Sequence, residues 1–380
     1  MAPSFRVAFF ASCDDNYIPT TAAALLSFRR FFGDARHGYF IVGSHISNAN
    51  ADLLLKLNVT FVDVSNLCKV FETHRNARCT KYVKECFYIA AGPSVFYQNT
   101  EYDFCLSLDG DVFCQREFDL AGLCKPVRHV GMRGVGPLRR CFEDRAVRFK
   151  GECNHRAELI RLGFPEETVD SPQTLEYNTG VIIWNVRGLN RWWFELCERV
   201  FVGLDGAFES DQDLISMAAA HPSVDVHEFD ECYNFNYSMD TYKANWKLWF
   251  DFYFRNRNVD GVYISHFIRE KPWIRGNAIF PMQQHLVNQW RAHIRSLPHG
   301  LDCRWEEARA DYEIKGGMLI QALMHALFMW HMVNHVVAIP NLKYTTPIFT
   351  YSVYILTLTK KLHSALFAFA PMLWYNCRIT

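Results

Sequence analysis

Residues 103–111 read DFCLSLDGD, an apolar run that ends in two acidic residues. The run up to Leu108 is typical of a strand that a parallel sheet buries on both faces. Asp109 and Asp111 follow it directly, so both carboxylates can reach one hard divalent cation such as Mg²⁺ or Mn²⁺. Ligands of parallel α/β sheets bind beyond the carboxyl ends of the strands, which is where this pair falls. The alternative is ordinary Asp-Gly-Asp turn chemistry, and the stretch alone favours neither interpretation.

Strand-like and helical stretches alternate around this run. Before it, short apolar runs occur at Phe5–Ser12, Gly38–Gly43 and Val59–Val64, and helical patterns lie between them at Pro19–Phe32 and Asn50–Leu57. Such alternation predicts an α/β fold with a mixed, mostly parallel sheet flanked by helices. The remaining expected strands are 103–108, Val127–Met132, Thr179–Trp184, Val224–Phe229 and Gly261–Phe267, and the remaining expected helices are Thr80–Gln98, Leu189–Val202 and Ser210–Ala220.

The chain has 380 residues, half of them hydrophobic, with 40 basic and 40 acidic residues. This composition excludes a disordered chain, and the zero net charge argues against a nucleic-acid-binding protein. The neutral total hides an asymmetry, because residues 314–380 contain five basic residues and no acidic one. We therefore expect a body at residues 1–312 and a hydrophobic, cationic helical tail at residues 313–380.

The tail has two interpretations. Met318–Ile339 is a run of 22 uncharged residues, long enough to span a bilayer, but its polar side chains fall within about half of the helix circumference. That pattern favours a helix lying on an anionic membrane surface. A helical cap on the body or a homodimer interface is nearly as well supported. No signal peptide precedes the first strand and the 13 cysteines show no paired spacing, which predicts reduced thiols and a cytoplasmic protein, peripheral at the cytosolic face of a membrane if the tail binds lipid.

A second polar motif occurs at Val262–Trp273, VYISHFIREKPW. His266 falls near the end of an expected strand and could be a third metal ligand, because one imidazole and two carboxylates suit Mn²⁺. Lys271, five residues further on, could face a diphosphate. For an isolated His, a buried ring that is hydrogen-bonded to backbone is the better supported alternative.

A third motif joins Asn178–Asn185, NTGVIIWN, to residues 210–213, SDQD. Asn and Gln amides both donate and accept hydrogen bonds, so these side chains could hold sugar hydroxyls. It is equally well supported that Asn178 is a turn residue and that SDQD begins a helix as its N-cap. Tyr233–Phe254 is dense in aromatic residues, which suits stacking on an acceptor sugar or, more often, core packing.

Together these motifs resemble the family 8 retaining glycosyltransferases, which have the GT-A fold. The landmarks of that family occur in order over roughly residues 5–275: DDNY at 14–17, LDGD at 108–111, NTGVIIWN with SDQD, and HFIREKPW at 266–273. The resemblance implies a metal-dependent transferase that moves a hexose, glucose or galactose, from a UDP-sugar to a hydroxyl of a glycan, glycolipid or protein acceptor. It also implies that the configuration at the anomeric carbon is retained.

The resemblance further implies a role for each matching residue. Mn²⁺ (or Mg²⁺) would be ligated by Asp109, Asp111 and His266. The UDP part of the donor would contact Ala11, Ser12, Asp14, Tyr17, Lys81, Asp109 and Lys271, with the Tyr17 ring stacked on the base. The catalytic set would comprise Asn178, Asp211, Gln212 and Lys271, with Asp211 the nearest candidate for a nucleophile. The family usually has Gly three residues after the metal-ligating His and Lys six after it; this chain has Arg269 at the first position and its Lys one residue early, so Arg269 could supply the phosphate contact instead.

Two other functions stay open. A sugar-1-phosphate nucleotidyltransferase usually carries a Gly-rich, basic loop after its first strand, whereas residues 13–16, CDDN, would repel a triphosphate there. A catalytically silent, membrane-associated sugar-nucleotide-binding protein would turn over no donor at all. The intact acidic pair and His266 weigh against this last interpretation.

Overall fold

The computed structural model describes residues 5–73, 84–98, 101–137, 155–170, 175–204, 208, 210–236, 261–267 and 281–297. The predictions for Lys81, Arg269 and Lys271 lie outside the described residues, as do the expected tail and most of the aromatic stretch after Tyr233. Among the residues that are described, no helix is both long and apolar enough to cross a membrane.

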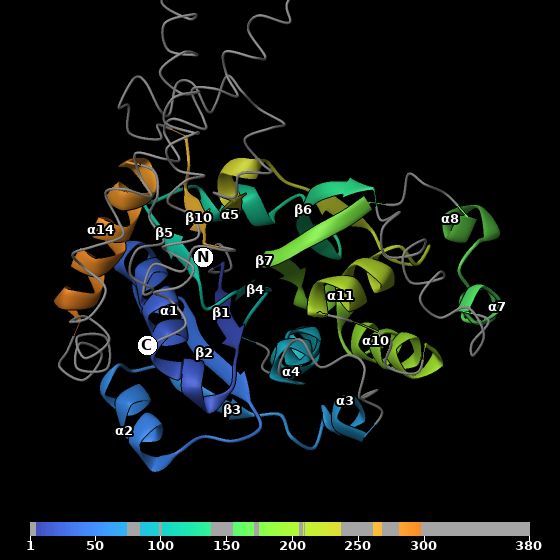
Figure 1. Cartoon of the computed structure of the whole chain (residues 1–380), viewed down its shortest axis with the longest axis horizontal. Helices are drawn as coiled ribbons and strands as arrows, with labels where there is room; N and C mark the ends of the chain where they lie inside the picture. The colour runs from blue at the N-terminus through green and yellow to red at the C-terminus, as the bar shows by residue number, and fades with distance from the viewer. Residues whose placement is uncertain are drawn as a thin grey trace, which may run out of the picture. The chain divides into compact units, whose positions relative to one another are not determined.

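A seven-stranded sheet forms the centre of the fold, with its strands in the order β3-β2-β1-β4-β7-β6-β8 (Figure 1). The first four strands in this order run parallel to one another, β7 is antiparallel to both β4 and β6, and β8 is parallel to β6. The sheet is therefore mixed and mostly parallel, as predicted. The bounds are β1 Val7–Ser12, β2 Gly38–Gly43, β3 Thr60–Asp63, β4 Phe104–Leu108, β6 Val130–Pro137, β7 Leu175–Asn185 and β8 Val226–Glu228.

The α-helices of the described residues are α1 Ile18–Phe32, α2 Asn48–Lys56, α3 Lys69–Thr73, α4 Gly92–Tyr97, α5 Leu120–Cys124, α7 His155–Arg161, α8 Glu166–Asp170, α9 Val186–Leu189, α10 Trp192–Gly203, α11 Asp211–Ala219 and α14 Pro281–Ser296. The 3-10 helices are η1 Asp15–Tyr17, η2 Lys84–Ala91 and η3 Glu231–Tyr233.

The side chains of strand β1 pack against helices on both faces of the large sheet. Its residues from Val7 to Ala11 are fully buried, which explains why the strand reads as one apolar run without polar alternation. Successive side chains point to opposite faces of a strand. The Phe9 ring packs on Phe28 of α1, with ring centroids 5.5 Å apart, whereas the Phe10 ring packs on Phe96 of α4, at 5.3 Å.

The layer beyond Phe10 holds a hydrophobic core, which η2, α4, α10 and α11 build against β4 and β7. Trp184 of β7 packs on Trp193 of α10, with ring centroids 5.1 Å apart, and its indole N–H donates to Ser107 Oγ of β4 at 2.9 Å. A Cβ on Gly92 would lie 2.1 Å from the Phe10 ring, so only glycine lets α4 approach β1 this closely. Within the expected helix Thr80–Gln98, the described residues form two elements, because η2 ends at Ala91 and α4 begins at Gly92.

A second, three-stranded sheet has the order β5-β10-β9, formed by Val112–Cys114, Ile264–His266 and Phe235–Asn236. Strand β10 is antiparallel to β5 and parallel to β9. Only three residues, Asp109-Gly110-Asp111, separate β4 of the large sheet from β5 of the small one. The acidic turn is therefore the place where the chain passes from one sheet to the other.

Candidate active site

The acidic turn is held from both sides by backbone hydrogen bonds. Asp109 N–H donates to the Gly180 carbonyl of β7 at 2.9 Å, and Val112 N–H closes the turn on the Asp109 carbonyl at 3.2 Å. Phe267 N–H, just after β10, donates to the Asp111 carbonyl at 3.0 Å. A Cβ on Gly110 would lie 2.7 Å from Thr21 Oγ1 of α1, so the glycine lets the turn sit against that helix.

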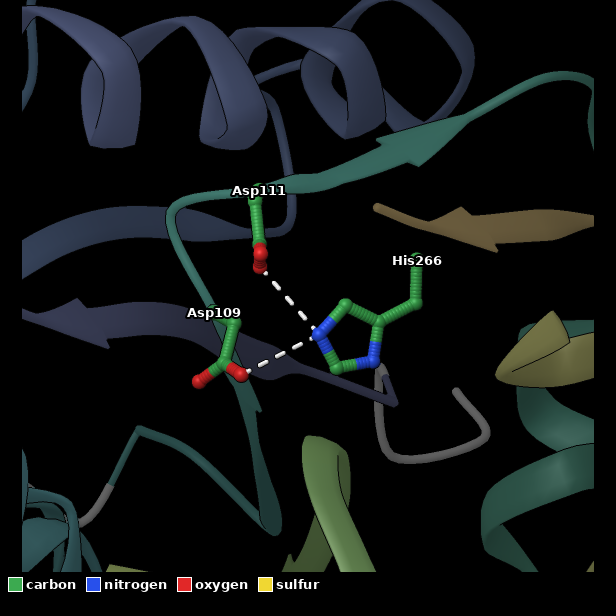
Figure 2. A group of neighbouring side chains, drawn as sticks. All are labelled: Asp109, Asp111 and His266. Atoms are coloured by element: carbon green, nitrogen blue, oxygen red, sulfur yellow. Dashed lines mark ion pairs between the residues drawn. The ribbon is translucent and has the colours of Figure 1, made fainter. Parts of the chain in front are cut away.

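The two carboxylates and His266 converge, as predicted (Figure 2). His266 Nε2 lies 3.2 Å from Asp111 Oδ1 and 3.3 Å from Asp109 Oδ2. His266 and Asp111 are buried, and Asp109 is half-exposed, so the cluster is open to ligand on the Asp109 side. Two hard oxygens and one imidazole nitrogen within 4.8 Å of one another fit a divalent cation that prefers octahedral coordination. An octahedral ion with bonds of about 2.1 Å holds adjacent ligands about 3 Å apart, close to the observed separations.

The charges of this cluster shift two pKa values. Burial alone would lower the pKa of His266, but the carboxylates, Asp111 above all, raise it from 6.5 to about 9. Burial and then the charge of Asp109 raise the pKa of the Asp211 carboxyl from 3.8 to about 7, although the Thr179 hydroxyl works against them. Without a cation, the site therefore holds protons at neutral pH that a cation would displace.

The start of α11 brings the predicted sugar-side residues to the same place. Ser210 N–H donates to Asp213 Oδ2 at 3.1 Å, which caps the helix at the residue before Asp211. Gln212 Oε1 accepts a hydrogen bond from Asn178 Nδ2 at 3.3 Å, and Gln212 Nε2 donates to Glu176 Oε1 at 2.6 Å. The Asn178 amide is therefore already hydrogen-bonded to another side chain of the protein. Glu176 is a residue that sequence reasoning missed, and its position two residues before Asn178 on β7 is the only signal that could have found it.

The imidazole of His266 has a second set of partners on its other side. His266 Nδ1 lies 3.1 Å from Asn178 Oδ1 and 3.0 Å from Asn234 Oδ1. Asn234 was not predicted, because it lies at the start of the aromatic stretch that was interpreted as core or acceptor site. It reaches the site because β9 pairs with β10, opposite Ser265 and His266.

The end of β1 lies beside the end of β4, since these parallel neighbours pair Phe10 with Ser107. This register brings Ala11, Ser12 and the turn after them to the same sheet edge as the acidic turn. Asp14 Oδ1 accepts from the backbone N–H groups of Asn16 and Tyr17 at 2.9 and 3.1 Å, and so forms η1. The Tyr17 side chain is half exposed.

Asp15, not predicted as a site residue, fixes this turn to the chain after β2. Its Oδ1 accepts from Ser47 N at 2.9 Å, Ser47 Oγ at 3.2 Å and Asn50 Nδ2 at 2.8 Å. Burial raises the pKa of the Asp15 carboxyl, but these hydrogen bonds lower it by more, so the pKa lies below its usual value. The cysteines among the described residues have free thiols.

Comparison with known proteins rests on the fold. No protein-family model matches the sequence, and no curated protein matches it either. The galactosyltransferase LgtC in complex with donor and acceptor sugar analogs is 19% identical, with 80% of this chain and 99% of LgtC covered and a TM-score of 0.52. An active-site mutant of LgtC covers the same shares at 18% identity, with a TM-score of 0.53. The chain therefore has the GT-A fold of these glycosyltransferases, which confirms the fold class predicted from the sequence.

Proposed function

We propose that this chain is a metal-dependent glycosyltransferase that moves a hexose from a UDP-sugar to a hydroxyl of a glycan, glycolipid or protein acceptor, with retention at the anomeric carbon. The observation that carries the proposal is the convergence of Asp109, Asp111 and His266 at the carboxyl end of a central strand in a GT-A fold. LgtC, a galactosyltransferase with the same fold, has been solved in complex with donor and acceptor sugar analogs, which supports the proposal.

The reaction breaks the bond between the anomeric carbon and the β-phosphate oxygen, and the electron pair leaves with UDP. The acceptor hydroxyl oxygen bonds to the anomeric carbon from the same face, and its proton passes to the leaving phosphate. Asp109, Asp111 and His266 would hold Mn²⁺ or Mg²⁺, which would stabilise the negative charge that develops on the departing diphosphate.

We assign the other predicted residues to the donor. The Tyr17 ring, which is half exposed, would stack on the uracil. Ala11, Ser12 and Asp14 would line the uridine pocket. Asp211 and Gln212 line the sugar. The phosphates require cations that the acidic turn does not provide, and Lys81, Lys271 and Arg269 are the candidates for them.

The metal assignment can be tested on the purified full chain by thermal unfolding. UDP at about 100 times its Kd should stabilise the wild type by about 2.7 kcal/mol when Mn²⁺ is present, and much less in EDTA. Asp111→Asn should abolish this stabilisation and the slow hydrolysis of UDP-glucose or UDP-galactose. Asp52→Asn, at an exposed position of α2, is the matched control and should behave as the wild type. UDP binding that is equally strong in EDTA and in Asp111→Asn would rule out the metal site, and pyrophosphate release from UTP and a sugar 1-phosphate would favour a nucleotidyltransferase.

We further propose that the protein is cytoplasmic and that the tail at residues 313–380 associates peripherally with an anionic membrane surface. The absence of acidic residues from 314 onward supports this. The full chain should float with vesicles that contain phosphatidylserine, and Lys360→Glu with Lys361→Glu should weaken that association without changing donor hydrolysis. If the wild type does not float with the vesicles, the membrane proposal is wrong. If the same substitutions dissociate a dimer, the tail serves assembly instead.

A further inference from the structure

One backbone amide fixes the orientation of two buried amide side chains beside His266. Gly180 N–H donates to Asn178 at 3.0 Å, and a backbone N–H can only donate, so the atom it faces is the side-chain oxygen. Asn234 Nδ2 donates to that same oxygen at 2.7 Å. The orientation of the Asn178 amide therefore determines that of Asn234, whose own oxygen is left on the side of the imidazole.

The oxygens of both amides face the same nitrogen of His266. Nδ1 lies 3.0 Å from Asn234 Oδ1 and 3.1 Å from Asn178 Oδ1. Two acceptors around one ring nitrogen require that this nitrogen carries the hydrogen. The Asn178 oxygen already accepts two hydrogen bonds, whereas the Asn234 oxygen has the shorter contact and is the natural acceptor of Nδ1–H. The opposite nitrogen, Nε2, is then the ring atom that can ligate a metal.

Asn234 is itself rigidly held. It is fully buried, its N–H donates to the Glu231 carbonyl at 3.1 Å, and its carbonyl accepts from Arg133 Nη1 at 2.7 Å. The second guanidinium nitrogen of Arg133 lies 3.3 Å from Glu231 Oε2. Strand β6 thus anchors η3 and β9, and through them the amide that faces the imidazole. A buried polar side chain with both ends committed is a strong constraint on its neighbour.

We propose that Asn234 is a positioning residue, whose side-chain oxygen accepts the Nδ1–H of His266 and so keeps Nε2 directed at Asp109 and Asp111. The inference rests on the metal site of the proposed function and assigns to it a residue outside the ligand set. Partners of this kind set the tautomer and the ring orientation of a metal-ligating His, and their loss typically weakens metal binding about 10- to 100-fold.

The test is direct measurement of Mn²⁺ binding to the full chain, by the electron paramagnetic resonance signal of the free ion, with no donor present. Asn234→Leu removes the acceptor and should weaken Mn²⁺ binding at least about 10-fold. Asn234→Asp keeps an acceptor for Nδ1–H and should retain binding within a few-fold of the wild type. Asn234→Val, smaller but equally unable to accept, replaces the Leu variant if that variant does not fold.

A matched control separates positioning from stability. Asn185, at the far end of β7, also holds backbone groups with its amide, donating to the Val127 carbonyl at 3.1 Å and accepting from Gly188 N–H at 3.0 Å. Asn185→Leu should lower the melting temperature and leave Mn²⁺ affinity unchanged. Equal Mn²⁺ affinity in Asn234→Leu, Asn234→Val and the wild type would overturn the positioning role and leave the proposed function intact, whereas a wild type that binds no Mn²⁺ would overturn both.

Discussion

His266 carries a proton that a metal ion bound at its Nε2 would have to displace. Its pKa of about 9, against 6.5 for an ordinary His, means that the metal-free ring is an imidazolium at neutral pH. We expect the apparent Mn²⁺ affinity to rise by up to about tenfold per pH unit below pH 9 and to level off above it. Calorimetry at pH 7 in buffers of different ionisation enthalpy should record about one proton released per Mn²⁺ bound. A release near zero would mean that this ring does not ligate the ion.

Asp211 differs from His266, because its surroundings disfavour the charged form of its side chain. Its pKa of about 7 lies above the usual 3.8, so the folded state binds a proton that the unfolded state has lost, and stability falls as pH rises from about 4 to 7. Asp211→Asn should therefore raise the free energy of unfolding of the metal-free protein at pH 8, by on the order of 2 kcal/mol, and reduce sugar transfer. Urea unfolding at pH 8 and pH 4 checks this, and a gain of equal size at both pH values would contradict it.

At the scale of elements, Gly180 of β7 determines how closely that strand can pass His266. A Cβ there would lie 2.1 Å from Cε1 and 2.2 Å from Nδ1 of the ring. Gly180→Ala should push the ring away from the carboxylates and weaken Mn²⁺ binding at least about 10-fold, with a loss of stability of about 1–3 kcal/mol.

The control for that substitution is Gly33→Ala, at the end of α1. Gly33 has a φ of 65° and open space where a Cβ would stand, so alanine there costs about 1–2 kcal/mol of backbone strain and displaces no neighbour. Thermal unfolding should show similar losses for both variants, while only Gly180→Ala changes Mn²⁺ affinity. If both variants bind Mn²⁺ as the wild type does, the ring has room to move and remain a ligand.

The elements also show what sequence patterns can and cannot predict. Gly38–Gly43 was expected as a strand and forms one with those bounds, because a strand buried in the middle of a sheet is a continuous apolar run. Strand β5 was missed, because three residues after a turn carry no periodicity, and the antiparallel course of β7 depends on its neighbours rather than on its own residues. Asp109, Asp111 and His266 were predicted as ligands and do converge. Asn234 was missed because its place depends on strand pairing that no local pattern encodes, and Glu176 was marked only by its position two residues before Asn178.

At the scale of the whole molecule, the GT-A fold persists at 18–19% identity to LgtC. The pattern of burial explains this tolerance. Most of the fully buried residues are apolar side chains that can exchange for others of similar volume, since a core requires hydrophobicity and size more than particular residues.

The passage of the chain from one sheet to the other at the acidic turn has a consequence for the kinetics of folding. Asp109 and Asp111 leave the large sheet, His266 belongs to the small one, and the chain between them builds most of the second half of the fold. The cluster is complete only once these distant segments have paired, so we expect it to form late in folding and a cation to bind only the nearly native protein. Mn²⁺ should then slow unfolding and leave the refolding rate almost unchanged, which stopped-flow measurements with and without EDTA can resolve. A metal ion bound at this cluster would then also lengthen the lifetime of the folded protein.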